Sequence, residues 1–189
     1  MEQLIQLDKD LFLFLNGLGT PTFDGFWMFI TGKWSAIPMY AVLLFLLYKK
    51  LGVRHTVLIA ALVGVMIACT DQLSNLFKLV LFLRPRPCYD DVILETMRLV
   101  KSRCGGPYGY FSAHAASSMA LAVFLGRLLQ PHVKYLFSFL ILWAVVVGYS
   151  RIYIGVHYPG DVLTGFVFGV AIALIILKLY KYLVFRFLR

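Results

Sequence analysis

The sequence predicts an all-α protein, a polytopic transmembrane helical bundle of five to six spans preceded by an amphipathic segment. Hydrophobic residues make up 61% of the 189-residue chain, charged residues only 14%, and the mean hydropathy is +0.82. Apolar runs recur along the whole length. Soluble domains carry about 25% charged residues, so this composition favours a chain surrounded largely by lipid.

Five apolar segments can cross a bilayer, and with the N-terminal segment they form one integral membrane domain over residues 1–189. A helix of about 20 apolar residues spans the hydrocarbon core. We expect the helical bundle to occupy 33–189, with these spans: 33–50, 55–83, 111–130, 133–150 and 159–183.

Residues 1–32 are expected to form an interfacial segment. Apolar residues recur there with rough helical periodicity: Leu4, Ile5, Leu7, Leu11, Phe12 and Leu15. The charged residues are assigned to the other face: Glu2, Asp8, Lys9 and Asp10. This pattern is typical of a helix lying on a membrane, and a short aromatic helix follows the break at Asn16–Pro21. The alternative is an additional irregular span, which would give six spans instead of five.

Basic residues are distributed unevenly between the two sides of the predicted spans. One side holds nine basic residues and no acidic residue: Lys49, Lys50, Arg54, Arg127, Lys134, Lys178, Lys181, Arg186 and Arg189. All nine acidic residues fall on the other side. The positive-inside rule makes the first side cytoplasmic. The net charge of +9 is therefore a topology signal, and no nucleic-acid partner is expected.

A first polar cluster lies where the span 55–83 reaches the outer side. Asp71, Asn75 and Lys78 are four and three residues apart, so they should share a helix face that points into the bundle. Arg84 and Arg86 follow, each before a proline that ends the helix and restricts the backbone around them.

Two further clusters emerge on the same side. Ser112 is suited to be the N-cap of the next helix, and His114 falls in its first turn, where free N–H groups favour an anion. Arg151, His157 and Asp161 are closely spaced between the last two spans. A guanidinium binds anionic oxygens, an imidazole attacks or moves a proton, and a carboxylate orients that imidazole. Phosphate chemistry is the function that these residues favour.

The outer loop, 84–110, contains Cys88 and Cys104. In an oxidising compartment these two thiols can close a disulfide. The acidic residues of the loop lack ligand-like spacing with a histidine, so we interpret them as solvated and predict no metal site.

Three motifs resemble those of the type 2 phosphatidic acid phosphatases, a family related to the vanadium haloperoxidases. They are Lys78 with Arg84-Pro85-Arg86-Pro87, then Ser112-Ala113-His114, then Ser150-Arg151 with Gly155, His157 and Asp161. The resemblance covers about residues 71–165, and the third motif matches at every defining position. The second motif departs from the usual Pro-Ser-Gly-His, since Phe111 and Ala113 replace the proline and glycine.

The first motif has an irregular spacing. Five residues separate Lys78 from Arg84 and seven separate it from Arg86, whereas the family spacing lies between these values. Because Arg86 heads the last Arg-Pro pair, we favour it as the phosphate ligand, and Arg84 is the alternative.

The resemblance implies a mechanism that needs neither a metal nor a cofactor. His157 attacks phosphorus and becomes a phosphohistidine, while Asp161 orients its other ring nitrogen. His114 protonates the leaving oxygen and then activates water. The phosphoryl oxygens are bound by these residues: Lys78, Arg86, Ser112 and Arg151, with Arg84 as the alternative to Arg86.

The expected function is hydrolysis of a phosphate or pyrophosphate headgroup on a membrane lipid. We expect a multi-pass protein of the bacterial inner membrane with its site facing the periplasm. Undecaprenyl diphosphate is the first-choice substrate; phosphatidylglycerol phosphate, phosphatidic acid and lipid A phosphate are alternatives. A transporter of anionic lipids is the alternative of another class, although broken inverted repeats, which would favour it, are not evident. The sequence specifies no oligomeric state.

Overall fold

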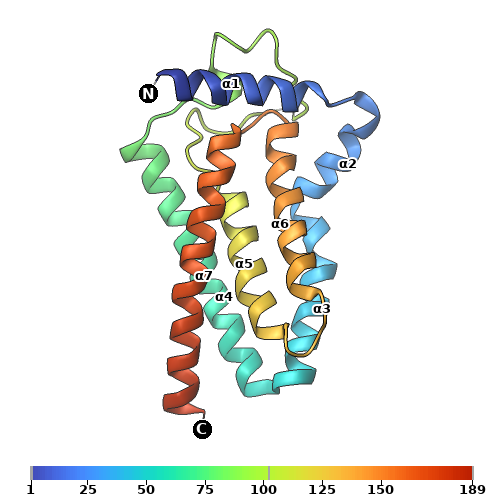
Figure 1. The fold of residues 1–189 in the computed structure, drawn as a ribbon, viewed down its shortest axis with the longest axis vertical. Helices are drawn as coiled ribbons and strands as arrows, with labels where there is room; N and C mark the ends of the chain where they lie inside the picture. The colour runs from blue at the N-terminus through green and yellow to red at the C-terminus, as the bar shows by residue number, and fades with distance from the viewer. Residues whose placement is uncertain (1, 102, 189) are drawn as a thin grey trace.

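Five helices stand side by side in the computed structural model, which describes residues 2–101 and 103–188 (Figure 1). They are α3 (Lys33–Leu51), α4 (Val53–Leu76), α5 (Ala113–Leu129), α6 (Leu136–Tyr153) and α7 (Pro159–Phe187). Two helices precede them, α1 (Glu2–Gly17) and α2 (Pro21–Thr31). The described residues form no β-strand, which confirms the predicted all-α class.

The helix α5 is the centre of the bundle. It packs mainly against α6 and α7, and most of its side chains are buried. Gly165 and Gly169 of α7 let the two backbones approach closely, since a Cβ added at Gly165 would lie 2.7 Å from the Ser112 carbonyl oxygen. The apolar core that surrounds α5 therefore fixes the height at which α5 begins, and Ser112 and His114 with it.

The five helices that stand side by side agree in number with the lower of the two predicted counts of spans, whereas the number that cross a membrane stays a prediction. Four helical segments of the described chain are long and apolar enough to span a membrane: Trp34–Leu51, Val53–Leu81, Leu136–Tyr153 and Pro159–Phe187. The helix α5 is apolar but has 17 residues, about 25 Å, and lies among the others. Figure 1 shows α2 running in the same direction as α3. We therefore count α2 and α3 together as one predicted span.

The helix α1 lies across one end of the bundle (Figure 1). Four of its exposed apolar residues form one stripe: Leu4, Leu7, Leu11 and Phe14. Phe12 and Asn16 are buried against the bundle, and Asp8 and Lys9 are half-buried. The prediction that Phe12 and Asp8 lie on opposite faces of the helix was therefore wrong. The helix therefore has one face buried against the bundle, one exposed polar face and one exposed apolar face. Its place at a membrane interface stays a prediction.

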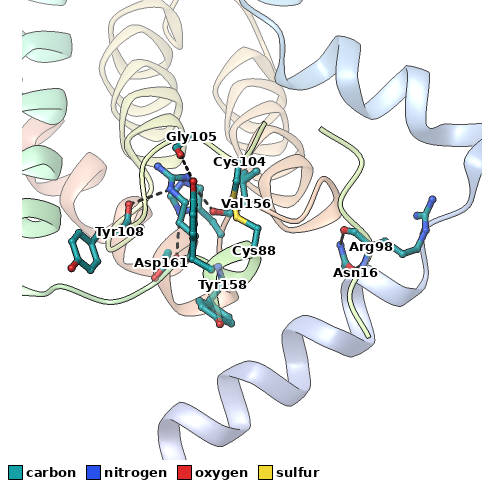
Figure 2. Close-up of a disulfide and its surroundings, with 12 residues drawn as sticks. Asn16, Cys88, Arg98, Cys104, Gly105, Tyr108, Val156, Tyr158 and Asp161 are labelled. Atoms are coloured by element: carbon teal, nitrogen blue, oxygen red, sulfur yellow. Dashed lines mark hydrogen bonds and ion pairs between the residues drawn. A yellow bond between two sulfur atoms is a disulfide. The ribbon is translucent and has the colours of Figure 1, made fainter. Parts of the chain in front are cut away.

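Asn16 fastens the end of α1 to the end of α6. Its Nδ2 donates to the carbonyl oxygens of Arg98, Ile152 and Tyr153 at 3.0, 3.1 and 2.9 Å, and its Oδ1 accepts the Arg98 N–H at 2.7 Å. Figure 2 shows Asn16 and Arg98 joined in this way. Because Asn16 is only 1% exposed and its amide is fully used, this contact holds α1 in one position.

The opposite end of the bundle carries the predicted cytoplasmic groups. The α3–α4 and α5–α6 connections and the C-terminal end of α7 lie there (Figure 1). Of the nine basic residues, Arg189 lies outside the described residues. At this end Nδ1 of His55 lies 2.8 Å from the Tyr180 hydroxyl, a contact between α4 and α7 that is distant from α1.

Candidate active site

The last turns of α4 widen into a π-helical segment, Phe77–Leu81, which contains Lys78. Such turns occur frequently at functional sites. Lys78 lies close enough to Arg86, Arg151 and Asp161 to interact with them electrostatically. Asp71 also interacts electrostatically with Lys78, but the Asp71 and Asn75 side chains are exposed, so the expectation that they point into the bundle was wrong.

Two extended segments of the outer loop, joined by a single β-bridge, hold the arginines of the first motif. Pro85 and Tyr108 form an antiparallel bridge, the Arg86 N–H donates to the Pro107 carbonyl at 2.9 Å, and the Gly109 N–H donates to the Arg84 carbonyl at 3.0 Å. Their side chains therefore leave a constrained backbone.

A disulfide between Cys88 and Cys104 closes the same loop, with the Cα atoms 6.4 Å apart. Figure 2 shows it beside Val156, which belongs to the buried cluster against which Cys104 packs. The Tyr89 hydroxyl also donates to the Gly105 carbonyl at 3.0 Å. These contacts secure the loop directly next to Arg86.

The Arg86 guanidinium faces the third motif. Its Nε donates to the Tyr108 carbonyl at 3.1 Å and its Nη1 to the Val156 carbonyl at 3.2 Å. The same Nη1 lies 3.3 Å from Nε2 of His157. Arg86 therefore lies against the ring nitrogen that the proposed chemistry uses.

The surroundings of His157 determine its tautomer. Arginine only donates hydrogen bonds, so Nε2, which faces Arg86, carries the lone pair. The proton then lies on Nδ1, which is 3.3 Å from Oδ2 of Asp161. Asp161 is itself fixed, because Oδ2 accepts the Tyr158 N–H at 3.0 Å and Oδ1 is 3.2 Å from Nη1 of Arg84. This pair presents an unprotonated nitrogen to the site.

Charge and burial keep this imidazole neutral. His157 is 2% exposed, and burial together with the cations Arg151, Arg86 and Lys78 holds its pKa well below its ordinary value. A backbone hydrogen bond with Gly109 opposes this shift without reversing it. At neutral pH His157 is therefore a neutral base and a competent nucleophile.

Arg151 is buried without a countercharge. The helix α6 extends to Tyr153, three residues beyond the predicted span, and ends before Gly155, whose φ of 83° breaks the helix. Arg151 therefore lies in its last turn, where Nη1 donates to the Thr31 hydroxyl. Its buried Nε has no hydrogen-bond partner among the described residues. A buried guanidinium in this state is suited to an anion.

Ser112 is the N-cap of α5, as predicted, and its Oγ accepts the Ala115 N–H at 3.4 Å. The hydroxyl is fully buried, so capping is its visible role, and its contact with phosphate stays a prediction. His114 is exposed in the first turn. It interacts electrostatically with Arg151 and His157, which brings the second and third motifs together.

Three site residues have no counterpart in the predictions. Thr31 of α2 holds Arg151, and Lys101 interacts electrostatically with Arg151 and Arg86. Gly109 permits close packing, because a Cβ there would lie 3.4 Å from Oδ2 of Asp161 and 2.9 Å from Cγ of Arg86. The positive charge of Lys101 was the only signal in the sequence that could have indicated any of them.

The cations around His157 differ from Arg84 and Arg98 in their ion pairs. Within the described chain, Lys78, Arg86 and Arg151 form no ion pair with a carboxylate, whereas Arg84 and Arg98 do. No three His, Cys, Asp or Glu side chains of the described residues are grouped so as to hold a metal ion. The arrangement offers a nucleophilic nitrogen, a second histidine and unpaired positive charge.

Comparison with known proteins gives a family and three named relatives. Residues 56–185 match the family model of the PAP2 superfamily. The chain is 36% identical over 170 residues to a lipid A 4'-phosphatase of Bacteroides thetaiotaomicron, covering 89% of this chain and 75% of that protein. It is 34% identical to a lipid A 4'-phosphatase of Porphyromonas gingivalis (96% and 76% covered). It is 31% identical to an undecaprenyl-diphosphatase of Sulfolobus acidocaldarius (89% and 76%).

Two solved structures have a similar fold. The crystal structure of Aquifex aeolicus LpxE matches with a TM-score of 0.68 and 25% identity, over 91% of this chain and 95% of that one. A transmembrane PAP2-type phosphatidylglycerolphosphate phosphatase from Bacillus subtilis matches with a TM-score of 0.73 and 17% identity, over 96% and 88%. Both comparisons agree with a multi-pass membrane protein.

Proposed function

Because the chain belongs to the PAP2 superfamily of membrane phosphatases, we propose that it removes a phosphate group from a lipid headgroup through a phosphohistidine on His157. One observation carries the proposal. Lys78, Arg86 and Arg151 converge on a neutral, buried histidine, and within the described chain no carboxylate pairs with them. A phosphate group supplies the negative charge that these cations lack.

In the first step, Nε2 of His157 attacks phosphorus and the bond from phosphorus to the lipid oxygen breaks. Asp161 accepts the hydrogen bond from Nδ1 and stabilises the positive charge that develops on the ring. His114 gives its proton to the leaving lipid oxygen. The bound phosphate brings negative charge close to His114, and a nearby negative charge favours the protonated form of an imidazole.

In the second step, His114 takes a proton from water, and the oxygen of that water attacks phosphorus. The phosphorus–nitrogen bond breaks, inorganic phosphate leaves, and His114 is again protonated. Both steps transfer charge to the phosphoryl oxygens, where Arg86 and Arg151 act as fixed donors.

We propose a phosphate on a lipid A-like glycolipid as the substrate. Two relatives, at 36% and 34% identity, are named as lipid A 4'-phosphatases, and they match 89% and 96% of this chain. Undecaprenyl diphosphate, the first choice from the sequence, becomes the second candidate, supported by the archaeal relative. Phosphatidylglycerol phosphate and phosphatidic acid are less favoured.

We further propose that the site faces the periplasm from the inner membrane. The site lies at the α1 end of the bundle, whereas the basic connections lie at the opposite end (Figure 1). A lipid in the outer leaflet would then present its headgroup at the level of His157.

The experiment is phosphate release by the purified protein in detergent across a panel of lipid A, undecaprenyl diphosphate, phosphatidylglycerol phosphate and phosphatidic acid. We expect the highest kcat/KM with lipid A, and unchanged rates in EDTA. A mock preparation from cells that do not express the protein serves as the blank for contaminating phosphatases. A higher kcat/KM with undecaprenyl diphosphate would make this second candidate the proposed substrate in place of lipid A. No release from any of these lipids would overturn the proposed function, and loss of activity in EDTA would overturn the metal-free mechanism.

A further inference from the structure

Asp8 of the amphipathic helix α1 contacts the site directly. Both carboxylate oxygens of Asp8 are in use: Oδ1 accepts the Gly160 N–H at 2.8 Å, and Oδ2 lies 2.7 Å from Nη2 of Arg84. The second contact is an ion pair and not an aligned hydrogen bond. Gly160 permits this approach, because a Cβ there would come within 2.8 Å of Oδ2 of Asp8.

Arg84 lies between two carboxylates. Its Nη2 pairs with Asp8, and its Nη1 lies 3.2 Å from Oδ1 of Asp161. The guanidinium carbon also lies 4.0 Å from the centre of the Tyr158 ring, which fixes the plane of the group. The charge of Arg84 is therefore already balanced, unlike that of Arg86, and it is directed at the carboxylate that orients His157.

A second contact from α1 supports the same arrangement. Tyr158, on which Arg84 stacks, donates its hydroxyl hydrogen to Oδ2 of Asp90 at 2.8 Å. Nζ of Lys9 lies 2.6 Å from the same oxygen. Neighbouring residues of α1 thus hold both the guanidinium and the ring beneath it.

We propose that Asp8 and Arg84 are positioning residues of the active site. Asp8 holds Arg84, and Arg84 holds the Asp161 carboxylate in the orientation that keeps the proton of His157 on Nδ1. The inference rests on the proposed role of His157 as the nucleophile. It removes Arg84 from the phosphate ligands and makes α1 part of the catalytic apparatus.

The test uses Asp8→Asn, in which the amide oxygen still accepts the Gly160 N–H while the charge opposite Arg84 is lost. Asp10→Asn is the matched control, since Asp10 is exposed on the same helix and, among the described residues, its carboxylate accepts a hydrogen bond only from Gln6. Arg84→Gln removes the guanidinium, and Arg84→Lys retains its charge. Each variant is purified in detergent, checked for thermal stability, and assayed for kcat and KM on the lipid with the highest activity.

We expect kcat to fall about tenfold in Asp8→Asn and about 100-fold in Arg84→Gln, with KM unchanged, because misorientation slows the chemical step. Arg84→Lys should recover part of the loss, and Asp10→Asn should equal the parent. The double variant should be no slower than Arg84→Gln alone, since Asp8 acts through Arg84.

Three results would overturn the inference. A raised KM with normal kcat in Arg84→Gln would make Arg84 a phosphate ligand. Normal kcat in Asp8→Asn, or losses that multiply in the double variant, would separate Asp8 from Arg84. The proposed function is tested separately by His157→Ala in the same assay. Turnover by His157→Ala would refute the role of His157 as the nucleophile. An inactive His157→Ala together with normal Asp8 and Arg84 variants would refute only the positioning role of Asp8 and Arg84.

Discussion

The two ends of the bundle bury different kinds of side chain. At the α1 end, Arg151, His157 and Asp161 are at most 6% exposed. At the other end, the contact between His55 and Tyr180 joins two helices that surround an apolar core. Burying a charge is costly, so a group of buried ionisable residues indicates chemistry, whereas exposed basic residues indicate orientation in the membrane. Each prediction below tests this contrast.

Loss of the nucleophile is expected to have the largest effect. His157→Ala removes the atom that bonds to phosphorus, so kcat should fall by roughly 10⁴-fold or more. Phosphate release and a thermal unfolding curve on the same preparation measure this. Retained turnover by a folded variant would exclude His157 as the nucleophile.

Removing His114 should have the next largest effect. Without the acid and base, kcat should fall by roughly 10²–10⁴-fold, while stability changes little because the side chain is exposed. His55→Ala, at the opposite end, is the matched control and should keep the parent kcat. If both substitutions have the same effect on kcat, the contrast between the ends fails.

Arg86 should affect both rate and pH dependence. Arg86→Gln removes a phosphate ligand, so kcat/KM should fall about 100-fold. It also removes one of the cations that lower the pKa of His157, and that pKa should rise. Protonation then begins at higher pH, so the acidic limb of kcat/KM against pH should shift upward. Arg86→Lys should keep the limb in place, and an unmoved limb in Arg86→Gln would contradict the electrostatic account.

The disulfide should have the smallest effect on activity. Cys88→Ala removes the cross-link between two cysteines that lie 16 residues apart in the sequence. The free energy of unfolding should therefore fall by about 3 kcal/mol. The Arg86 hydrogen bonds remain, so kcat should change far less than in Arg86→Gln. Thermal unfolding and mass spectrometry of protein purified without reductant measure both effects. Two free thiols in the parent protein would contradict the cross-link.

Much of the fold follows from the sequence. The spans, their alternation and the N-cap at Ser112 follow from apolar length, basic residues and local capping chemistry, which act over short stretches of chain. The resemblance also indicated His114, Arg151, His157 and Asp161, because their spacing is a local motif. Short stretches of sequence could not decide whether Arg84 or Arg86 contacts phosphate. The directions of the two side chains depend on backbone hydrogen bonds to residues 107–109 and on a carboxylate from α1.

The residues that the sequence did not reveal all act across long separations. Thr31 and Asp8 meet their partners, Arg151 and Arg84, only after α1 and α2 pack against the bundle. The sequence pattern assigned Asp8 to the charged face of an amphipathic helix, opposite Phe12. Its burial becomes visible only because Phe12 and Asn16 occupy the same face and face the protein.

The central claim is that phosphorus bonds to Nε2 of His157, and it can be tested by trapping the intermediate. The protein is mixed with a ³²P-labelled aryl phosphate, whose leaving group departs without a proton, then quenched in alkali and digested for mass spectrometry. We predict an acid-labile phosphoramidate on His157 that accumulates in His114→Ala, where hydrolysis is slow, and is absent from His157→Ala. Label on another residue, or rapid turnover of the ester with no labelled protein at any time, would contradict the account.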